Sequence, residues 1–446
     1  MTPGESYNQL LLRDEAATRE QAAWFRDALA RAGVTFDGEP MRSFLRPHFV
    51  ERAAWNLVRD QGRRLLETAA RVARQVFDGD ASRLCAWLGV PEAARPWVAI
   101  DPGPPDVVLS RLDAFLTPAG ARFIEINSDA PAGFGYGDRM AAVFQELPAF
   151  RAFAARHRVA YQASGPALVA SVMHAWRQAG RAPARANPVV AIVDYAEVKT
   201  RADQEILKDV FGAEGVVCVL ADPREVALHQ GYLFAGDRAI DVVYRRAVLS
   251  ELLERAADVK AFLEAYRRGA AVFVNSFRCH LSEDKAFLAL LQAPECARFL
   301  SEGERAQIRM TVPWTSRIEE ARVERDGRMV DLVPWVLANR ARLVLKPAHG
   351  YGGRAVFVGD ETAPEAWERA VRDGLGQAWI VQERVAIPEE RFPVVEDDKV
   401  TLSSLKVNVN PFYVAGAEVG AVTRASRDSV INVSAGGGSV PTFVVG

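Results

Sequence analysis

Cysteine is scarce in this sequence: the 446 residues include four, and no two of them form a C-x-x-C pair. Disulfide frameworks and zinc sites both need closely patterned cysteines, so neither is predicted. The chain also contains no run of about eighteen apolar residues, the length that a membrane-spanning helix needs. Its first residues, MTPGESYNQL, do not combine a charged segment with an apolar one as a secretion signal does. These absences predict a cytoplasmic protein with no membrane partner.

A large net charge is missing as well. The 55 lysines and arginines nearly balance the 57 aspartates and glutamates, which leaves a formal net charge of −2. Nucleic acid is therefore not an expected partner, because nucleic-acid-binding proteins carry strongly basic surfaces. With 49% hydrophobic and 25% charged residues, the composition is that of a globular protein large enough for two or three domains.

The hydrophobic pattern divides the chain into four regions and predicts a mixed α/β (α+β) fold. In residues 1–100, apolar residues recur at helical spacing over 14–31 and again over about 50–77, which predicts a helical N-terminal region. In residues 101–150, the pattern changes after the segment DPGPPD to two strand-like runs separated by a turn. The second region is therefore expected to be a hairpin.

The third region, residues 151–275, alternates strands with helices. The apolar runs PVVAIVDY, VVCVLADP and AIDVVYRR are typical of strands, and a helical segment follows the first of them. This alternation predicts a parallel sheet with helices on its faces, which would bind a substrate. Ligands of such sheets lie beyond the strand ends, here near residues 194–201 and near Arg245 and Arg246.

The hairpin sequence DAFLTPAGARFIEINSDAP places polar residues on alternate positions of both strands. We expect a three-residue loop, Pro118 to Gly120, with the glycine in the left-handed conformation that such loops usually need. Counting outward from that loop predicts four facing pairs on one side of the hairpin. They are Thr117 with Ala121, Phe115 with Phe123, Asp113 with Glu125, and Arg111 with Asn127.

Two acids that face each other across a hairpin repel, and a cation between them would remove the repulsion. Magnesium fits Asp113, Glu125 and Asn127, because it takes carboxylate and amide oxygens and shares its other positions with water and substrate phosphates. The alternative is a solvated hairpin whose acids face water and Arg111, with Asn127 present only as a turn residue.

The fourth region, residues 276–446, carries the basic residues. In LVLKPAHGYGGRAVFVG, a strand ends in Lys346, and Gly350, Gly352 and Gly353 follow in a turn. Glycines let backbone N–H groups approach an anion closely, and lysine binds phosphate as a compact charge. The segment is neither a Walker loop nor a dinucleotide-binding fingerprint, because its glycines lie between two strands. It predicts a flap over a polyphosphate, and the alternative is a glycine-rich hairpin with an incidental lysine.

Further polar residues in the same region fit a nucleotide. WIVQERV is an apolar strand that ends in Gln382, Glu383, Arg384 and Val385, the kind of interdomain edge where adenine could pair with the main chain. SEDKAFLALL places Lys285 at the beginning of a helix, within reach of phosphates.

The last segment, VGAVTRASRDSVINVSAGGGSVP, offers Arg424, Asn432, Gly436 and Gly437. An arginine stabilises charge on a transferring phosphoryl group or acyl phosphate, and glycines admit a substrate close to the backbone. The alternative for this segment is that Arg424 and Arg427 are a surface arginine pair with no role in binding.

Together these motifs resemble the ATP-grasp superfamily, but in a rearranged order. In ordinary members, SRLDAF and IEINSDAPAG would come last, whereas here they precede VVYRR, DKAFLALL, LVLKP, IVQERV and the terminal arginine-glycine segment. This order is similar to that of the circularly permuted branch, which includes eukaryotic-type glutathione synthetase. A permuted order is physically tolerable because a site needs strand ends close in space, whatever chain connects them. The loops AHGYGG and SDAPAGFGYGD differ from those of glutathione synthetase.

The resemblance implies a role for each motif. It makes residues 101–150 the hairpin that completes the ATP-grasp domain, residues 151–275 the substrate domain, and residues 276–446 the nucleotide-binding region. It implies ATP and Mg²⁺ as cofactors, with Asp113, Glu125 and Asn127 as metal ligands. It implies that Lys285 and Lys346 bind phosphates, that Gln382 to Val385 bind adenine, that Arg111 and Arg424 act on the acyl phosphate, and that Arg246 binds a substrate carboxylate. Glu389 and Glu390 are candidates for binding the ribose.

The activity implied by the resemblance is an ATP-dependent carboxylate-amine ligase that forms an amide bond through an acyl phosphate. Its partners would be small acids and amines such as amino acids or peptides, and the family also suggests a homodimer. Two alternatives stay open: a small-molecule kinase with the same nucleotide site, and an ATP-binding protein without catalytic activity.

Overall fold

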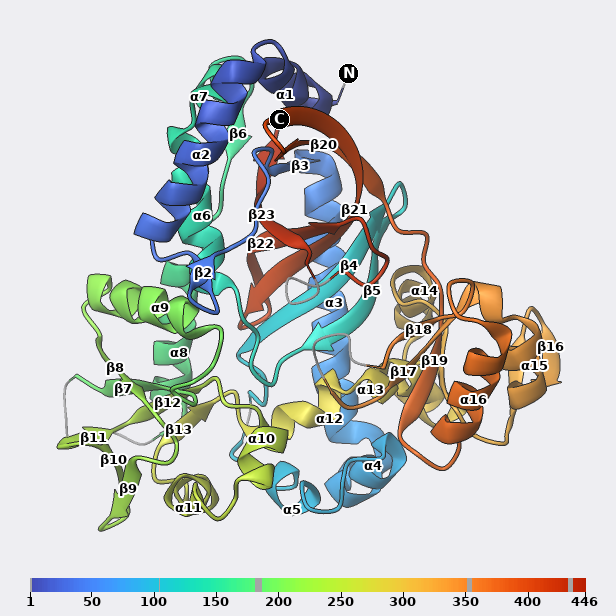
Figure 1. Ribbon diagram of the computed structural model, residues 1–446. Coiled ribbons are helices and arrows are strands. Elements are labelled where there is room, and N and C mark those ends of the chain that lie inside the picture. Colours follow the sequence, from blue (N-terminus) through green and yellow to red (C-terminus); the bar gives the residue numbers. More distant parts are fainter. Residues whose placement is uncertain (1, 104, 181–186, 351–354, 432–435) are drawn as a thin grey trace.

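The computed structural model describes residues 2–103, 105–180, 187–350, 355–431 and 436–446. Helices and strands are mixed, and the described residues form one sheet of eight strands and two sheets of four strands besides smaller ones. Figure 1 shows the large sheet above the centre, one four-stranded sheet at the lower left, and the other at the right. The mixed α/β fold predicted from the hydrophobic pattern is confirmed.

The first hundred residues are mainly helical, as predicted. The expected helix at residues 14–31 begins after Asp14, whose side chain caps it by accepting a hydrogen bond of 3.0 Å from Ala17 N. The helices of this region are α1 (Pro3–Leu12), α2 (Glu15–Arg31), α3 (Arg52–Gln75), α4 (Ala81–Leu88) and α5 (Arg95–Val98). The region also contributes β1 (Thr35–Phe36), β2 (Glu39–Pro40) and β3 (His48–Glu51), which the sequence pattern does not indicate.

The eight-stranded sheet combines the two ends of the chain. Its main path runs in the order β3-β23-β22-β21-β4-β5, and β20 and β6 pair beside it. The predicted hairpin consists of β4 (Leu109–Thr117) and β5 (Gly120–Asn127). The remaining strands are β6 (Val159–Ala160), β20 (Glu389–Glu396), β21 (Lys399–Val414), β22 (Ala417–Ser426) and β23 (Gly438–Val445). Because β4 pairs with β21, the hairpin lies directly beside residues almost 300 positions later in the chain.

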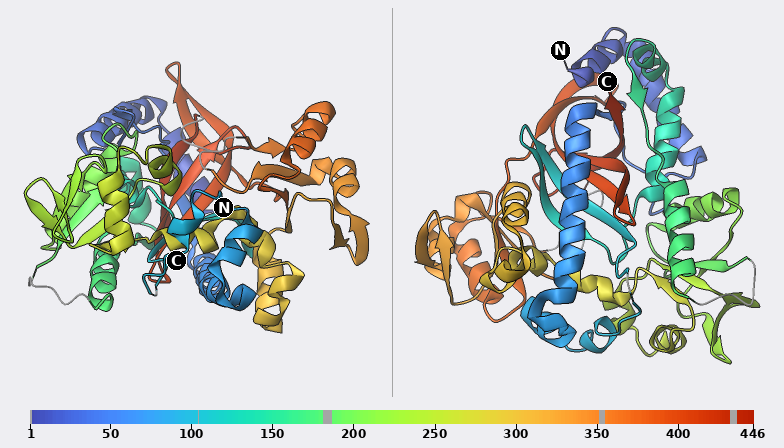
Figure 2. Two further views of the ribbon diagram at one scale, coloured as in Figure 1. Left: turned by 90° about the horizontal axis from the view of Figure 1, so that it is seen from below. Right: turned by 180° about the vertical axis from the view of Figure 1, so that it is seen from behind.

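Helix α3 packs along one face of this sheet, as the rear view in Figure 2 shows. The close approach depends on Gly62: a Cβ atom at this position would lie 2.0 Å from the hydroxyl oxygen of Tyr413. That hydroxyl donates a hydrogen bond of 3.1 Å to Val58 O in the same helix. Helices α6 (Phe134–Glu146) and α7 (Pro148–Ala154) follow the hairpin and pack with α1 and α2.

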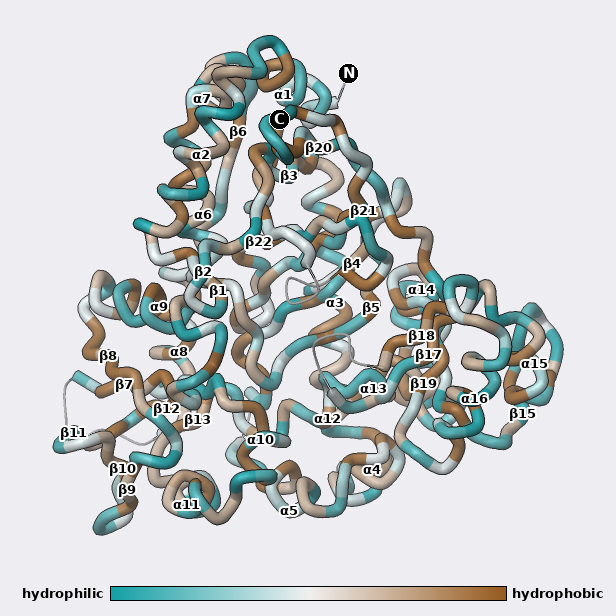
Figure 3. The backbone as a smooth tube through the Cα atoms, viewed as in Figure 1, coloured by the Kyte–Doolittle hydropathy of each residue, from teal (hydrophilic) through white to brown (hydrophobic). Residues whose placement is uncertain are grey.

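The predicted parallel sheet is present in the third region, with the order β13-β12-β7-β8. Its strands are β7 (Val189–Val193), β8 (Val217–Ala221), β12 (Val242–Arg245) and β13 (Val272–Val274), and its helices are α8 (Gly165–Gln178), α9 (Arg201–Ala213), α10 (Leu249–Glu254) and α11 (Lys260–Arg268). Strand β7 is a hydrophobic stretch whose last four residues are buried (Figure 3). A small antiparallel sheet, β9 (Val226–His229), β10 (Tyr232–Ala235) and β11 (Arg238–Ile240), is inserted between β8 and β12.

The second four-stranded sheet has the order β14-β19-β17-β18. Its strands are β14 (Thr315–Arg317), β17 (Leu343–Pro347), β18 (Phe357–Val358) and β19 (Trp379–Glu383). The helices α13 (Lys285–Leu290) and α16 (Pro364–Gly374) contact this sheet, and α15 (Leu332–Ala338) packs with α16 and with the hairpin β15 (Arg322–Arg325) and β16 (Arg328–Asp331). The helices α12 (His280–Glu283) and α14 (Glu302–Thr311) contact β5 and α3 instead. In the described part of the chain, no helix combines the length and the apolar character needed to cross a membrane.

Candidate active site

A cavity of about 250 Å³ is lined by residues of the eight-stranded sheet and of the sheet that contains β17 and β19. Most residues singled out in the sequence line it together, although they come from opposite ends of the chain. They are Arg111, Asp113, Glu125, Asn127, Lys285, Lys346, Gly350, Gln382, Glu383, Arg384, Val385 and Arg424.

The hairpin register brings the polar pairs together as predicted. Arg111 pairs with Asn127, and Asp113 pairs with Glu125. The predicted loop is wrong, however, because Thr117 pairs with Gly120 and the turn has only two residues, Pro118 and Ala119. Gly120 does adopt a left-handed φ of 113°.

A bulge at Ile124 offsets the shorter turn. The register shifts between Asp113 and Ala114, so that Ala114 faces Phe123 and Phe115 faces Arg122. The predicted pairs Thr117–Ala121 and Phe115–Phe123 are therefore wrong, while the polar pairs beyond the bulge are right. One further consequence is that Phe123 is fully buried in the core and Ile124 lines the cavity. The bulge thus aims the polar end of the hairpin at the cavity.

Asp113 is the centre of the polar network. Its Oδ1 accepts hydrogen bonds from Arg111 Nε at 2.9 Å and from Asn127 Nδ2 at 3.1 Å, and its Oδ2 accepts one from Arg424 Nη1 at 3.3 Å. Burial alone would raise the pKa of Asp113, but the two arginines outweigh it and hold the pKa below its usual value. Asp113 is therefore ionised at neutral pH.

Glu125 pairs with Lys285, whose Nζ lies 2.9 Å from Oε1. Lys285 is the first residue of α13, which is capped by Asp284 through a hydrogen bond of 2.7 Å from Ala286 N. The Lys285 ammonium also donates to Gly350 O at 2.8 Å. Although burial lowers the pKa of Lys285, Glu125 raises it above its usual value. Lys285 thus links the hairpin to Gly350, in the glycine-rich turn that follows Lys346.

Lys346 is buried at the end of β17. Its Nζ donates to Ile124 O at 3.1 Å and to Gln382 Oε1 at 3.0 Å, and Gln382 in turn donates to Thr315 Oγ1 at 2.9 Å. Burial lowers the pKa of Lys346 to about 8, and the nearby Lys285 ammonium adds to that effect. The charges of Glu125 and Asp113 oppose this lowering of the Lys346 pKa but do not outweigh it.

The predicted adenine segment lines the cavity, but part of its main chain is already bonded. Glu383 N donates to Trp314 O at 2.7 Å and Arg384 N donates to Arg342 O at 2.8 Å. Those two N–H groups are therefore not available to a base. The Arg384 side chain pairs with Asp360, away from the hairpin acids.

Arg111 and Arg424 converge on the same carboxylate and are close enough to affect each other. Burial, and then the charge of Arg111, lower the pKa of Arg424 to about 10. Arg384 and Glu383 pair with residues outside the lining. Among the other described residues of the lining, four cations (Arg111, Lys285, Lys346 and Arg424) face two acids (Asp113 and Glu125), which leaves an excess of two positive charges when all are ionised. A buried excess of positive charge is costly unless an anion offsets it, so the cavity is suited to a polyanion.

Several predicted residues lie elsewhere. Gly352, Gly353 and Asn432 are outside the described residues. Among the described residues that line the cavity, Gly436, Gly437 and Arg246 do not occur. Gly436 O accepts a hydrogen bond of 2.7 Å from Arg42 Nη1. The Arg246 guanidinium is buried and donates to the carbonyl oxygens of Ala130 and Pro131 at 2.7 and 2.5 Å. It therefore holds the loop that follows Asn127 at the end of β5.

The two glutamates considered for the ribose also lie outside the lining of this cavity, as far as the chain is described. Glu390 pairs with Arg46 and with His48, whose Nε2 lies 3.0 Å from Oε1. Glu389 accepts a hydrogen bond of 2.8 Å from Ser404 Oγ and lines a neighbouring cavity with Arg384 and Lys406.

Asn408 on β21 was not predicted from the sequence, yet it lines the cavity and donates a hydrogen bond of 3.0 Å to Ala114 O. The alternation in KVNVNPF placed a polar residue on every second position of an apolar strand, and that signal could have revealed it. Ser429, which also lines the cavity, follows β22 and carries no comparable signal.

Known proteins share the sequence pattern and the fold of this chain. The sequence matches the family described as circularly permuted ATP-grasp type 2 over residues 105–426. It is 29% identical over 227 residues to an uncharacterized protein of Mycobacterium tuberculosis, which covers 47% of this chain and 38% of that protein. It is 28% identical over 276 residues to a Frankia alni protein named "Putative glutamate–cysteine ligase 2-3", which covers 58% of this chain and 30% of that protein. The matched part of the chain thus spans about a third of the length of these curated relatives.

A solved structure with a similar fold is the apo form of a glutathione synthetase-like effector from Globodera pallida. The TM-score is 0.65 with 12% sequence identity, and the match covers 97% of this chain and 98% of the effector. At this identity the likeness concerns the fold, which both chains share over almost their whole length.

Proposed function

Because the chain belongs to the circularly permuted ATP-grasp type 2 family, we propose that it is an ATP- and magnesium-dependent ligase that joins a carboxylic acid to an amine. The observation that carries the proposal is the meeting of two opposed acids, Asp113 and Glu125, with basic residues from later in the chain around one cavity. Those basic residues are Lys285, Lys346 and Arg424. A nucleoside triphosphate and its metal would satisfy both sets of charges. The small-molecule acid and amine would be amino acids or peptides.

The donor set fits magnesium. Two carboxylates and one amide, from Asp113, Glu125 and Asn127, are hard oxygen ligands that leave positions for water and phosphate oxygens. Without a metal these acids are neutralised by Arg111, Arg424 and Lys285. When bound, magnesium supplies charge that offsets the repulsion between a carboxylate nucleophile and a triphosphate.

Each basic residue would have a separate task. Lys285 and Lys346 would hold phosphate oxygens, since each ammonium lies at the cavity wall between the two sheets. Arg111 and Arg424 meet at Asp113, and two guanidinium groups so placed can hold the planar oxygens of a carboxylate or acyl phosphate. The apolar side chains of Val344, Val358 and Ile387 line the same cavity and would contact the adenine ring.

The reaction would occur in two steps. A carboxylate oxygen of the acid attacks the terminal phosphorus of ATP, the bond to the bridging oxygen of ADP breaks, and an acyl phosphate forms. The amine nitrogen then attacks the acyl carbon and phosphate leaves with the bonding electrons, while the extra proton on nitrogen passes to solvent. Arg111 and Arg424 would stabilise the negative charge on the carbonyl oxygen and phosphate in the second step.

The name of the Frankia alni relative supports an ATP-dependent ligase acting on small amino-acid substrates, although this chain covers only 30% of that protein. We therefore assign the reaction class and leave both substrates open.

The test is an incubation with ATP, magnesium and pools of carboxylic acids and amines, followed by measurement of ADP, AMP and phosphate. The ligase predicts ADP and phosphate in equal amounts, formed at full rate only with a matched acid and amine. AMP formation would contradict the acyl-phosphate route. ADP formed without an amine, together with a stable phosphorylated product, would instead identify a kinase.

A further inference from the structure

The open end of the β4–β5 hairpin is held by one short segment, residues 275–285. β4 begins at Leu109, and β5 ends at Asn127, directly before Ser128. The segment that holds these two points connects β13 of the parallel sheet to Lys285 at the cavity. Lys285 lines the cavity, whereas Asn275 and Glu283 of the same segment are not among the described residues that line it.

Asn275 makes four hydrogen bonds to the open end of the hairpin. Its Oδ1 accepts from Val108 N at 2.7 Å and from Leu109 N at 3.0 Å. Its Nδ2 donates to Leu109 O at 2.7 Å and to Ser128 O at 2.6 Å. The Asn275 side chain is buried, and these four bonds use both of its donor hydrogens and both of its acceptor lone pairs. It therefore holds the start of β4 beside the residue that follows β5.

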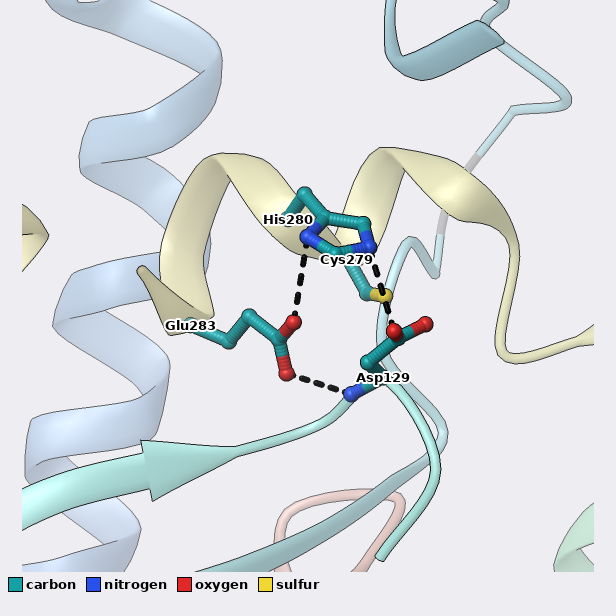
Figure 4. A group of neighbouring side chains, drawn as sticks. All are labelled: Asp129, Cys279, His280 and Glu283. Atoms are coloured by element: carbon teal, nitrogen blue, oxygen red, sulfur yellow. Dashed lines mark hydrogen bonds and ion pairs between the residues drawn. The ribbon is translucent and has the colours of Figure 1, made fainter. Parts of the chain in front are cut away.

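Glu283 binds the two residues that directly follow the hairpin. Its Oε2 accepts hydrogen bonds from Ser128 N at 2.6 Å and from Asp129 N, and its Oε1 lies 3.2 Å from His280 Nδ1. Figure 4 shows His280 between two carboxylates, with Nε2 3.3 Å from Asp129 Oδ2. Arg245 at the end of β12 completes the group by pairing with Asp129.

Asp129, Cys279, His280 and Glu283 also have the composition of a metal site, and their ligand atoms lie within 4.8 Å of one another. The charges argue against a metal. Arg245 and a protonated His280 already balance the two acids, and Arg245 Nη2 lies 3.6 Å from Cys279 Sγ. Burial opposes protonation of His280, but Asp129 and Glu283 raise its pKa to about 9, while burial raises the pKa of the Cys279 thiol. A metal would have to displace both of these tightly held protons.

We infer that Asn275, His280 and Glu283 form a hairpin clamp, a set of positioning residues that fixes the metal-binding end of β4–β5 relative to Lys285. Ser128 directly follows Asn127, and Glu283 is two residues before Lys285, so each side of the clamp adjoins a residue of the proposed site. The role given to those residues rests on the proposed function. Residues that orient metal ligands typically change metal affinity by about 10- to 100-fold when they are replaced.

The test compares Asn275→Ala and Glu283→Ala with a matched control, Glu390→Ala. Glu390 is likewise paired with an arginine and a histidine, Arg46 and His48, but lies outside the lining of the cavity. Calorimetry measures the Kd of a non-hydrolysable ATP analogue with magnesium and with EDTA. We expect both clamp variants to raise the Kd about tenfold in magnesium, to leave it within about twofold in EDTA, and to lower Tm no more than the control does.

Equal effects of the clamp variants and Glu390→Ala, or an unchanged Kd in magnesium, would overturn the clamp. Should an alanine variant fail to fold, Glu283→Gln and Glu390→Gln provide the same comparison with isosteric side chains. Zinc bound stoichiometrically to the full chain and lost in Cys279→Ser would also overturn it, because the four-residue group would then be a metal site.

If the proposed function is wrong, the wild-type chain itself will not bind the magnesium nucleotide in the calorimeter. The clamp would then be tested by amide hydrogen exchange, where it predicts that protection at Ser128 and Asp129 is lost in Glu283→Ala and kept in Glu390→Ala. Protection that is unchanged in Glu283→Ala would refute it.

Discussion

The ammonium of Lys346 donates a hydrogen bond of 3.1 Å to the carbonyl oxygen of Ile124, the extra residue of the β5 bulge. A second hydrogen bond, of 3.0 Å, goes to Gln382 Oε1 on β19. One lysine thus connects the hairpin from the first third of the chain to the small sheet near its end. Since an ammonium has three donors, one is left for a ligand in the cavity.

Lys346→Met is expected to weaken ATP binding at least tenfold, because it removes the buried charge while keeping the length of the side chain. A charge-assisted hydrogen bond to phosphate contributes about 1.5–3 kcal/mol, which corresponds to that change in affinity. Titration calorimetry with magnesium and an ATP analogue provides the measurement. The control is Lys260→Met at an exposed position on α11. Equal affinity in both variants would show that Lys346 does not contact the nucleotide.

ATP binding at about pH 9 is expected to be accompanied by proton uptake at Lys346. The pKa of about 8 in the free protein leaves this amine mostly neutral there, and a nearby phosphate would raise the pKa and protonate it. Between pH 8 and the ordinary lysine value of 10.5, the unfolded chain binds this proton more than the folded chain does, so this group makes the stability of the free protein rise with pH.

Proton uptake is measured by calorimetry at about pH 9 in two buffers that differ in ionisation enthalpy. On ATP binding, the wild-type chain should take up a substantial fraction of one proton through Lys346. Lys346→Met should lack that contribution, so its total proton uptake should be smaller by the same fraction. Identical uptake in both proteins would assign the proton to another group.

Asp113→Asn is expected to remove the stimulation of ATP binding by magnesium while leaving binding in EDTA equal or tighter. The substitution removes a metal ligand, yet it also removes a negative charge beside Arg111 and Arg424, which makes the cavity more positive. Magnesium stimulation that persists in this variant would exclude Asp113 as a ligand.

The same variant is expected to lose about 3 kcal/mol of unfolding free energy, because two buried arginines lose their carboxylate. Asp60→Asn is the matched control. Asp60 also pairs with two arginines, Arg63 and Arg64, but on the surface, where such pairs contribute about 1 kcal/mol or less. Denaturant unfolding of both variants measures the difference.

Much of the site was predictable because it depends on local spacing. Alternation along β4 and β5 puts Asp113 and Glu125 on the same face, and a three-residue loop would place them directly opposite each other. The predicted three-residue loop was wrong, and the bulge at Ile124 restored the offset that the shorter turn removed. The polar pairs were therefore predicted correctly from an incorrect turn.

The remaining features depend on contacts between distant segments, which residue spacing does not encode. β3 lies in a helical region and forms a strand only because it pairs in parallel with β23. Asn275 and Glu283 look like an ordinary loop asparagine and helix glutamate until the fold brings Leu109 and Ser128 beside them. The order of the motifs along the chain was enough to predict the family. The contacts of Asn275 and Glu283 with the hairpin became visible only in the structure.

Glu390→Gln is expected to flatten the acid side of the stability profile without changing nucleotide affinity at neutral pH. Burial alone would raise the pKa of Glu390, but His48 and Arg46 outweigh it and lower the pKa from 4.5 to about 2. A carboxylate with a lowered pKa in the folded state contributes stability that is present above pH 4.5 and is lost as the pH falls toward 2. The contribution is on the order of 3 kcal/mol.

Urea unfolding from pH 6 to about pH 3 should therefore show a smaller loss of unfolding free energy for Glu390→Gln than for the wild-type chain. Parallel profiles of the two proteins would mean that Glu390 titrates normally.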